Sequence, residues 1–191
     1  MKKGGSKQKG SQFEREICKQ LGLWWTQDLD EPRDDIFWLC SQSGGRATTR
    51  AKQNIDTAYS QGDVTFIDPV GAPFISQVLL ELKRGYTKDI SILDFIDKKK
   101  GDPLLVKWWK KAKDEQELAG RKYTIILFRR DRHISCILLS LQMARDIEDW
   151  FGHTPNESIQ IKSTDFNFVV IKLDAFLNWC HPNFFEKEQN E

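Results

Sequence analysis

The clearest β pattern in the chain is a pair of apolar segments, at 64–68 and 74–83, separated by the turn sequence 69–73. Valine, isoleucine, leucine and phenylalanine dominate both segments, and the prolines and glycine between them favour a turn. The pattern predicts a β-hairpin. If the hairpin is centred on Ala72, Asp63 lies opposite Glu81, whereas a centre two residues earlier would separate them.

Helical patterns lie on both sides of this hairpin. A helix is predicted from Ser11, where Ser11 and Glu14 have capping-box spacing, to a stop at Gly22. Its apolar stripe consists of Phe13, Ile17 and Leu21. A second helix is predicted after Asp102-Pro103 and ends near Gly120.

The remaining patterns complete an alternating order of helices and strands. We expect a short strand at 36–40, two strands at 123–128 and 134–139, a helix at 141–151 and a strand-helix segment at 166–179. This order predicts an α/β protein with a mixed sheet that is covered by helices on both faces.

Length and composition limit the class of protein. The 191 residues suffice for one domain, and 39% hydrophobic with 30% charged residues excludes a membrane protein or a low-complexity chain. The start of the chain has lysines but no hydrophobic stretch, so we expect no secretory signal. The four cysteines show no zinc-type spacing, which fits free thiols in a reducing, cytoplasmic compartment.

The net charge of +1 does not mark a nucleic-acid-binding protein, but the charges are unevenly distributed. Lysine and arginine gather in residues 1–10, in 98–113 and in 121–132. Solvated surface faces would explain any one of these clusters. Three clusters in one small domain favour a partner rich in phosphate.

One set of ionisable residues is unusual for a sheet. Glu81 and Lys83 are two positions apart in a predicted strand and so project from the same face, and the predicted register adds Asp63. Two converging carboxylates repel each other unless a cation lies between them, and Mg²⁺ prefers carboxylate oxygens. The alternative is a surface ion pair, since the triplet that starts at Asp97 has the same acid-x-lysine pattern inside a lysine run.

These residues resemble the PD-(D/E)XK nuclease superfamily. Gly62-Asp63 followed by Glu81-Leu82-Lys83 is similar to its central motif, and residues 9–16 are similar to the first helix of its Holliday-junction resolvases. The loop Ser43–Arg46 resembles the serine-glycine loop of those enzymes. The resemblance covers residues 9–140 and implies a three-layer, restriction-endonuclease-like fold with a central mixed sheet of about five strands.

The resemblance also implies roles for individual residues. Asp63 and Glu81 would be metal ligands together with the Leu82 carbonyl, and Lys83 would orient or help deprotonate the attacking water and offset charge at the phosphorane. Glu14 would be catalytic and would complete the metal site directly or through water, although the capping box alone also explains it. The cofactor would be Mg²⁺, and we expect Mn²⁺ to substitute.

The sequence departs from the family in two places. Gly62 stands where the name-giving motif has proline, and Glu14 and Asp63 are 49 positions apart (63 minus 14), about twice the spacing in the small resolvases. Residues 23–60 therefore carry an insertion within a single domain at 11–185. We expect a flexible basic tail at 1–10, a DNA-contacting loop at 41–50 and a disordered end at 186–191.

Further residues are candidates for DNA contacts. Besides Arg15, which the resemblance places on a phosphate, they are Ser43, Arg46, Arg50, Arg84, Lys107, Lys110 and Lys111, each with ordinary surface exposure as the alternative. Trp24, Trp25 and Trp38 are able to stack on bases, but burial in the core is the expected outcome.

The sequence thus predicts a Mg²⁺-dependent DNA endonuclease. We expect cleavage of branched or otherwise structured DNA, as in recombination or repair, and a homodimer, because two strands must be cut. The alternatives are a less selective or restriction-type DNase of the same fold, a nuclease for RNA, and a catalytically inactive DNA-binding or regulatory protein on a nuclease fold. No membrane partner is expected.

Overall fold

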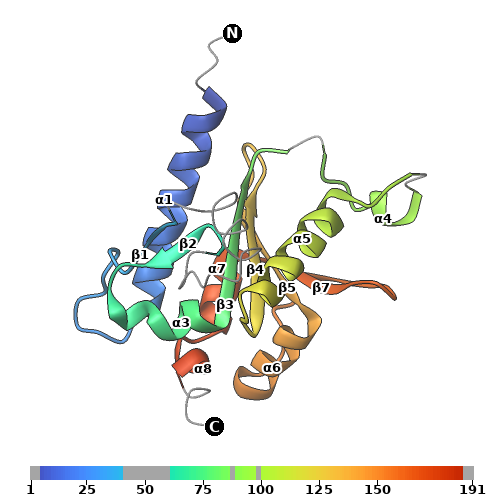
Figure 1. Cartoon of the computed structure of the whole chain (residues 1–191). Coiled ribbons are helices and arrows are strands. Elements are labelled where there is room, and N and C mark those ends of the chain that lie inside the picture. The colour runs from blue at the N-terminus through green and yellow to red at the C-terminus, as the bar shows by residue number, and fades with distance from the viewer. Residues whose placement is uncertain (1–4, 41–60, 87–88, 98–99, 187–191) are drawn as a thin grey trace.

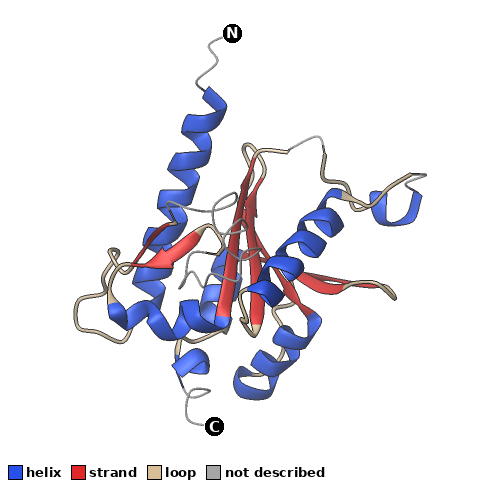
Figure 2. Ribbon diagram, viewed as in Figure 1, coloured by secondary structure: helices blue, strands red, loops and turns tan. Residues whose placement is uncertain are grey.

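The protein has a central sheet with helices on both faces (Figures 1 and 2). The computed structural model describes residues 5–40, 61–86, 89–97 and 100–186. The strands are β1 (Phe37–Leu39), β2 (Val64–Phe66), β3 (Val78–Arg84), β4 (Tyr123–Arg129), β5 (Ser135–Ser140), β6 (Ser158–Lys162) and β7 (Asn167–Lys172). The helices are α1 (Gly5–Trp25), α3 (Ala72–Gln77), α4 (Asp94–Asp97), α5 (Leu104–Leu118), α6 (Leu141–Phe151), α7 (Leu173–Trp179) and α8 (Asn183–Glu186), with a 3-10 turn η1 at Pro69–Gly71.

The main sheet has five strands in the order β3-β4-β5-β7-β6. Strand β3 is parallel to β4, and the other neighbours are antiparallel. The predicted α/β class with a mixed sheet of about five strands between helices is therefore confirmed, in agreement with a restriction-endonuclease-like fold.

Two apolar clusters fill the space between the sheet and its helices. One lies against α1, α3, α6, α7 and α8 and takes Leu80 and Leu82 from β3. The other lies against α5 and takes Leu79 from the same strand. Because side chains alternate along a strand, Glu81 and Lys83 belong to the α5 face together with Leu79.

The predicted hairpin between 64–68 and 74–83 is wrong. Strand β2 instead pairs with β1 in a separate two-stranded ribbon, with Leu39 opposite Val64. Residues 69–77 are helical because Asp68 accepts a hydrogen bond from the Val70 N–H, and Pro69 and Pro73 occupy first-turn positions where their missing N–H has no consequence. Only the strand starting at Val78 joins the main sheet.

The first helix is longer than predicted. It begins at Gly5, so residues 5–10 are helical and Ser11 does not cap it. It also continues through Gly22 to Trp25. A side chain at position 22 would lie 2.9 Å from the Arg33 carbonyl oxygen, so the glycine permits a close approach of the following loop and is not a stop signal.

Most of the elements after residue 100 lie where they were predicted. Strands β4 and β5 and helix α6 lie where the apolar patterns placed them, as do β7 and α7. The short helices α4 and α8 and the exposed strand β6 were not predicted. The loop 41–50, most of the insertion 23–60 and the C-terminal residues 187–191 lie outside the described residues.

The thiols of Cys18, Cys136 and Cys180 are free, and those of Cys18 and Cys180 are buried. Among the residues with described positions, no helix combines the length and apolar character that crossing a bilayer requires.

Candidate active site

Asp63 lies against the outer edge of β3. Its backbone N–H donates to the Leu80 carbonyl at 2.7 Å, and its Oδ2 accepts from the Leu82 N–H at 2.8 Å. The Asp63 carbonyl in turn accepts from the Cys40 N–H at 2.9 Å, which connects it to the end of β1. Thus Asp63 lies beside Leu80–Leu82, although no hairpin links the two segments.

Gly62 makes this approach possible. Its φ is +83°, a value that strains residues with a side chain, and an added Cβ would lie 2.8 Å from the Leu80 carbonyl oxygen. Proline cannot adopt this conformation, since its ring holds φ near about −65°. The departure from the name-giving motif at position 62 therefore has a local backbone cause.

Glu81 and Lys83 project together from the α5 face of β3. Lys83 Nζ forms an ion pair with Glu81 Oε2, as predicted from their two-residue spacing. Glu81 is only 5% exposed, and Lys83 is partly buried. A buried carboxylate at this position is compatible with the fold because the ammonium group compensates its charge.

Helix α5 adds two residues that the sequence analysis did not combine into a site. The Glu115 side chain lies close to that of Glu81, and it pairs with Lys111 at 3.1 Å, one helical turn away. The charges of Lys111 and Asp63 also interact. Lys111 was predicted as a DNA contact, whereas Glu115 was missed. The only signal for it was an i,i+4 lysine–glutamate spacing, which is common on solvated helices.

Burial and like charge act on the Asp63 carboxyl. Burial raises the pKa of Asp63 to about 6, and the negative charges of Glu81 and Glu14 act in the same direction. The Leu82 N–H and the Lys83 ammonium oppose this rise. Asp63 is thus a desolvated carboxyl whose charged form lacks full compensation within the protein.

The other two carboxyls shift in opposite directions. Burial alone would raise the pKa of Glu81, but Lys83, Glu115 and Lys111 outweigh it and leave this pKa below its ordinary value. Burial and the charge of Glu81 raise the pKa of Glu115. Of the three acids, Glu81 is thus the one whose charged form the protein's own groups stabilise most, through its contact with Lys83.

Glu14 lies on α1, which packs on the face of the sheet opposite to α5. Its negative charge, like that of Asp63, raises the pKa of the buried Cys18 thiol, although burial is the larger cause. Arg15 is exposed. The predicted Ser11–Glu14 capping box does not form because both residues lie inside the helix.

Glu16 and Arg84 both contact residues at the end of β4 and in the turn that follows it. Both carboxylate oxygens of Glu16 accept from Arg129, at 2.9 and 2.6 Å. Arg84 donates to the carbonyls of Arg129 and Arg130 and pairs with Asp131 at 3.3 Å. Arg84 thus secures the β4–β5 turn.

The other predicted contact residues are dispersed. Lys107 and Lys110 are exposed on α5, and Lys110 pairs with Asp102 at 2.9 Å. Ser43, Arg46 and Arg50 lie outside the described residues. Trp24 and Trp25 are buried in the core, as expected, whereas Trp38 is 49% exposed on β1.

The donor set suits a hard divalent cation. Asp63 and Glu81 provide carboxylate oxygens, and the Leu82 carbonyl points to the same edge of β3 as its N–H, which faces Asp63. No group of three or more acidic, histidine or cysteine side chains in the described ranges lies close enough to hold a metal ion. Mg²⁺ is compatible with two carboxylates because it retains several waters.

Comparison with known proteins gives one result. Residues 5–187 match the model of a protein family described as phage putative PDDEXK endonuclease, so the match includes the residues after 140 that the earlier resemblance left without a counterpart. A search of curated proteins found no match, and neither did a search of solved structures.

Proposed function

Because the chain belongs to the family described as phage putative PDDEXK endonuclease, we propose that it is a metal-dependent DNA endonuclease with its active site at Asp63, Glu81 and Lys83. The observation that carries the proposal is the convergence of the buried Glu81 and the partly buried Asp63 beside one lysine at the edge of β3. Family membership supports the nuclease function, and the convergence of these side chains supports the location of its active site.

Mg²⁺ is the cofactor that this donor set favours, with Mn²⁺ as a substitute. Asp63, Glu81 and the Leu82 carbonyl would hold it, and Glu14 would contribute directly or through water. The ion would supply Lewis-acid stabilisation of a phosphate oxygen and a more acidic water.

The protein's own groups have separate tasks. Asp63 and Glu81 place negative charge where a cation is required, and the Leu82 N–H orients the Asp63 carboxylate. Lys83, held by Glu81, orients the attacking water and offsets the charge that develops on the phosphate oxygens. Lys111, held by Glu115, adds a second positive charge on the α5 side.

The preferred substrate in this proposal is branched or otherwise structured DNA. The support is the similarity of residues 9–16 and of the loop Ser43–Arg46 to Holliday-junction resolvases. A homodimer belongs to the same proposal, because coordinated cleavage of two strands needs two sites.

The direct test is a cleavage panel. Purified protein with Mg²⁺ or Mn²⁺ should nick or cut a four-way junction, a flap or duplex DNA, and EDTA should stop the reaction. Parallel RNA substrates separate a DNase from an RNase. Lack of cleavage on every substrate, together with retained DNA binding, would favour the catalytically inactive DNA-binding protein instead.

Binding should also depend strongly on salt. Phosphate contacts by lysine and arginine release counterions, so affinity should fall steeply between low and moderate salt. Molar-mass measurement with and without DNA tests the dimer. A salt-independent affinity would remove the basic residues from the proposal.

A further inference from the structure

The chain leaves the proposed site in a strained backbone conformation. Gly85 and Tyr86 directly follow β3 and have φ values of +99° and +60°. Tyr86 and Arg132 are the two non-glycine residues with positive φ in the described part of the chain. This conformation is unfavourable for a bulky side chain, and such strain tends to occur at functional positions.

An aromatic contact supports the Tyr86 ring from one side. The ring meets Trp108 of α5 edge-on, with centroids 5.1 Å apart and an interplanar angle of 75°. Trp108 packs in turn on Phe128 at 6.0 Å, and Phe128 is the strand partner of Lys83. The ring is therefore tied to the strand pair that carries the site.

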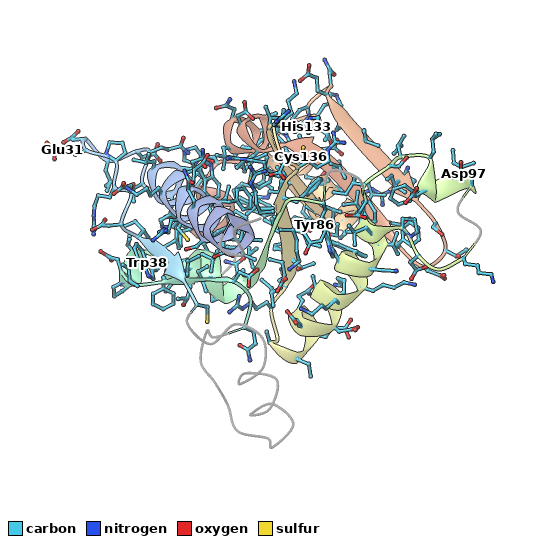
Figure 3. All side chains as sticks on the ribbon, turned by 90° about the horizontal axis from the view of Figure 1, so that it is seen from above. Glu31, Trp38, Tyr86, Asp97, His133 and Cys136 are labelled. Carbon is cyan, nitrogen blue, oxygen red and sulfur yellow. The ribbon has the colours of Figure 1, made fainter. Side chains whose placement is uncertain are left out.

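The Tyr86 residue is nevertheless 45% exposed, while Trp108 below it is 9% exposed. The strain is thus not compensated by burial of the ring in the core. Figure 3 shows Tyr86 on the upper surface of the molecule, close to α5. A supported ring that remains open to solvent is suited to contact with another planar group.

Lysines lie near Tyr86 along β3 and α5. Tyr86 follows Lys83 by three residues, and Trp108 precedes Lys111 by less than one helical turn. Lys107, next to Trp108, is exposed and has no ion-pair partner among the described residues. The aromatic ring is thus accompanied by ammonium groups that suit a phosphate backbone.

We propose that Tyr86 stacks on an unpaired nucleobase of DNA close to the phosphodiester that is cleaved. This inference rests on the proposed nuclease function and concerns the DNA shape that the site accepts. Bases in a continuous duplex are stacked on each other and offer no free face, whereas a junction, flap or bulge exposes one. Stacking tolerates any base, so Tyr86 would select structure and not sequence.

The test compares two DNA duplexes that differ at one position. In one, a 2-aminopurine nucleotide is unpaired, and in the other it is paired. Binding is measured in EDTA, so that cleavage does not interfere, from the fluorescence of 2-aminopurine, which stacking quenches. The wild-type chain should quench the unpaired probe and bind it more tightly than the paired one.

The variants then assign this preference to the ring. Tyr86→Ala should reduce the affinity ratio of unpaired to paired duplex by roughly tenfold, as loss of one stacking contact does. Tyr86→Phe keeps the ring and should retain the ratio. Trp150→Ala removes an equally exposed aromatic residue from α6 and serves as the matched control.

The outcomes separate this inference from the proposed function. A wild-type chain that cleaves DNA but does not quench the unpaired probe, or a Tyr86→Ala variant with an unchanged ratio, overturns the stacking role alone. A wild-type chain that neither binds nor cleaves DNA overturns both. Thermal denaturation of Tyr86→Ala and Tyr86→Phe verifies that the variants are folded.

Discussion

The carboxylate of Asp63 accepts a 2.8 Å hydrogen bond from the backbone N–H of Leu82. Asp63 precedes β2 of the small ribbon, whereas Leu82 belongs to β3 of the main sheet. This hydrogen bond thus holds Asp63, at the start of the two-stranded ribbon, beside Glu81 and Lys83 of the main sheet. The proposed catalytic geometry depends on how these two sheets meet.

The first prediction concerns Asp63. Asp63→Asn keeps an acceptor for the Leu82 N–H but removes the charge that a divalent cation requires, so cleavage should fall on the order of 100-fold or more. DNA affinity should change little. Asp97→Asn, which alters a similar acid-x-lysine triplet on the exposed α4, is the matched control and should cleave like the wild type. Persisting activity in Asp63→Asn would place the active site elsewhere.

The second prediction concerns Gly62. Gly62→Pro restores the name-giving motif of the superfamily, yet we expect it to destabilise the protein by roughly 3 kcal/mol and to abolish cleavage, because proline cannot adopt a positive φ. Chemical denaturation and a cleavage assay measure the two effects. Gly120→Pro changes another glycine with positive φ, but at an exposed helix end remote from the site, and should lose stability without losing the chemistry. Full activity of Gly62→Pro would contradict the backbone argument.

The third prediction concerns Glu115. Glu115→Gln weakens the hold on Lys111 and changes the contact with Glu81, so kcat should fall about tenfold while the KM for DNA changes less. Glu117→Gln alters an exposed residue of the same helix and provides the control. An equal loss in both variants would indicate a general effect of charge on α5.

The fourth prediction uses the Glu16–Arg129 pair. The hydrogen bond and charge of Arg129 hold the pKa of Glu16 below its ordinary value of 4.5. A lowered pKa in the folded state stabilises the protein above the unfolded-state pKa, and this contribution disappears as pH falls through the folded-state pKa. Since Glu16 is partly solvated, the contribution should be about 1 kcal/mol at most.

Glu16→Gln should therefore be less stable than the wild type at neutral pH and equally stable in strong acid. Urea denaturation at both pH values measures the difference. Glu31→Gln, at an exposed loop position, should behave like the wild type throughout. A difference that persists in acid would mean that Glu16 acts through packing and not through its charge.

Local patterns predicted the second half of the fold well. Strands β4 and β5 and helix α6 are continuous apolar or strongly amphipathic segments with clear boundaries, and they appear almost where expected. Strand β6 is largely exposed and mixes polar with apolar residues, so its sequence shows no hydrophobic periodicity that indicates a strand. The predicted end of the first helix at Gly22 was wrong because a glycine can also serve a close tertiary contact, here with the backbone of Arg33.

The sequence predicted which residues form the proposed site better than it predicted how the chain brings them together. The same-face position of Glu81 and Lys83 follows from strand periodicity alone. The closeness of Asp63 was inferred from a hairpin that does not exist, and it arises instead from a ribbon that packs on the edge of β3. Glu115 was missed because the crossing of α5 over β3 is a tertiary arrangement that no local spacing encodes.

Asp63 also covers part of an open sheet edge. Strand β3 is terminal in the five-stranded sheet, and its Leu80 carbonyl and Leu82 N–H face outward from β4. Exposed groups of this kind are templates on which a foreign strand can add, and fibrous aggregates grow in that way. Because Asp63 engages both groups, the residue that we expect to hold the metal ion also closes this border of the sheet to other chains.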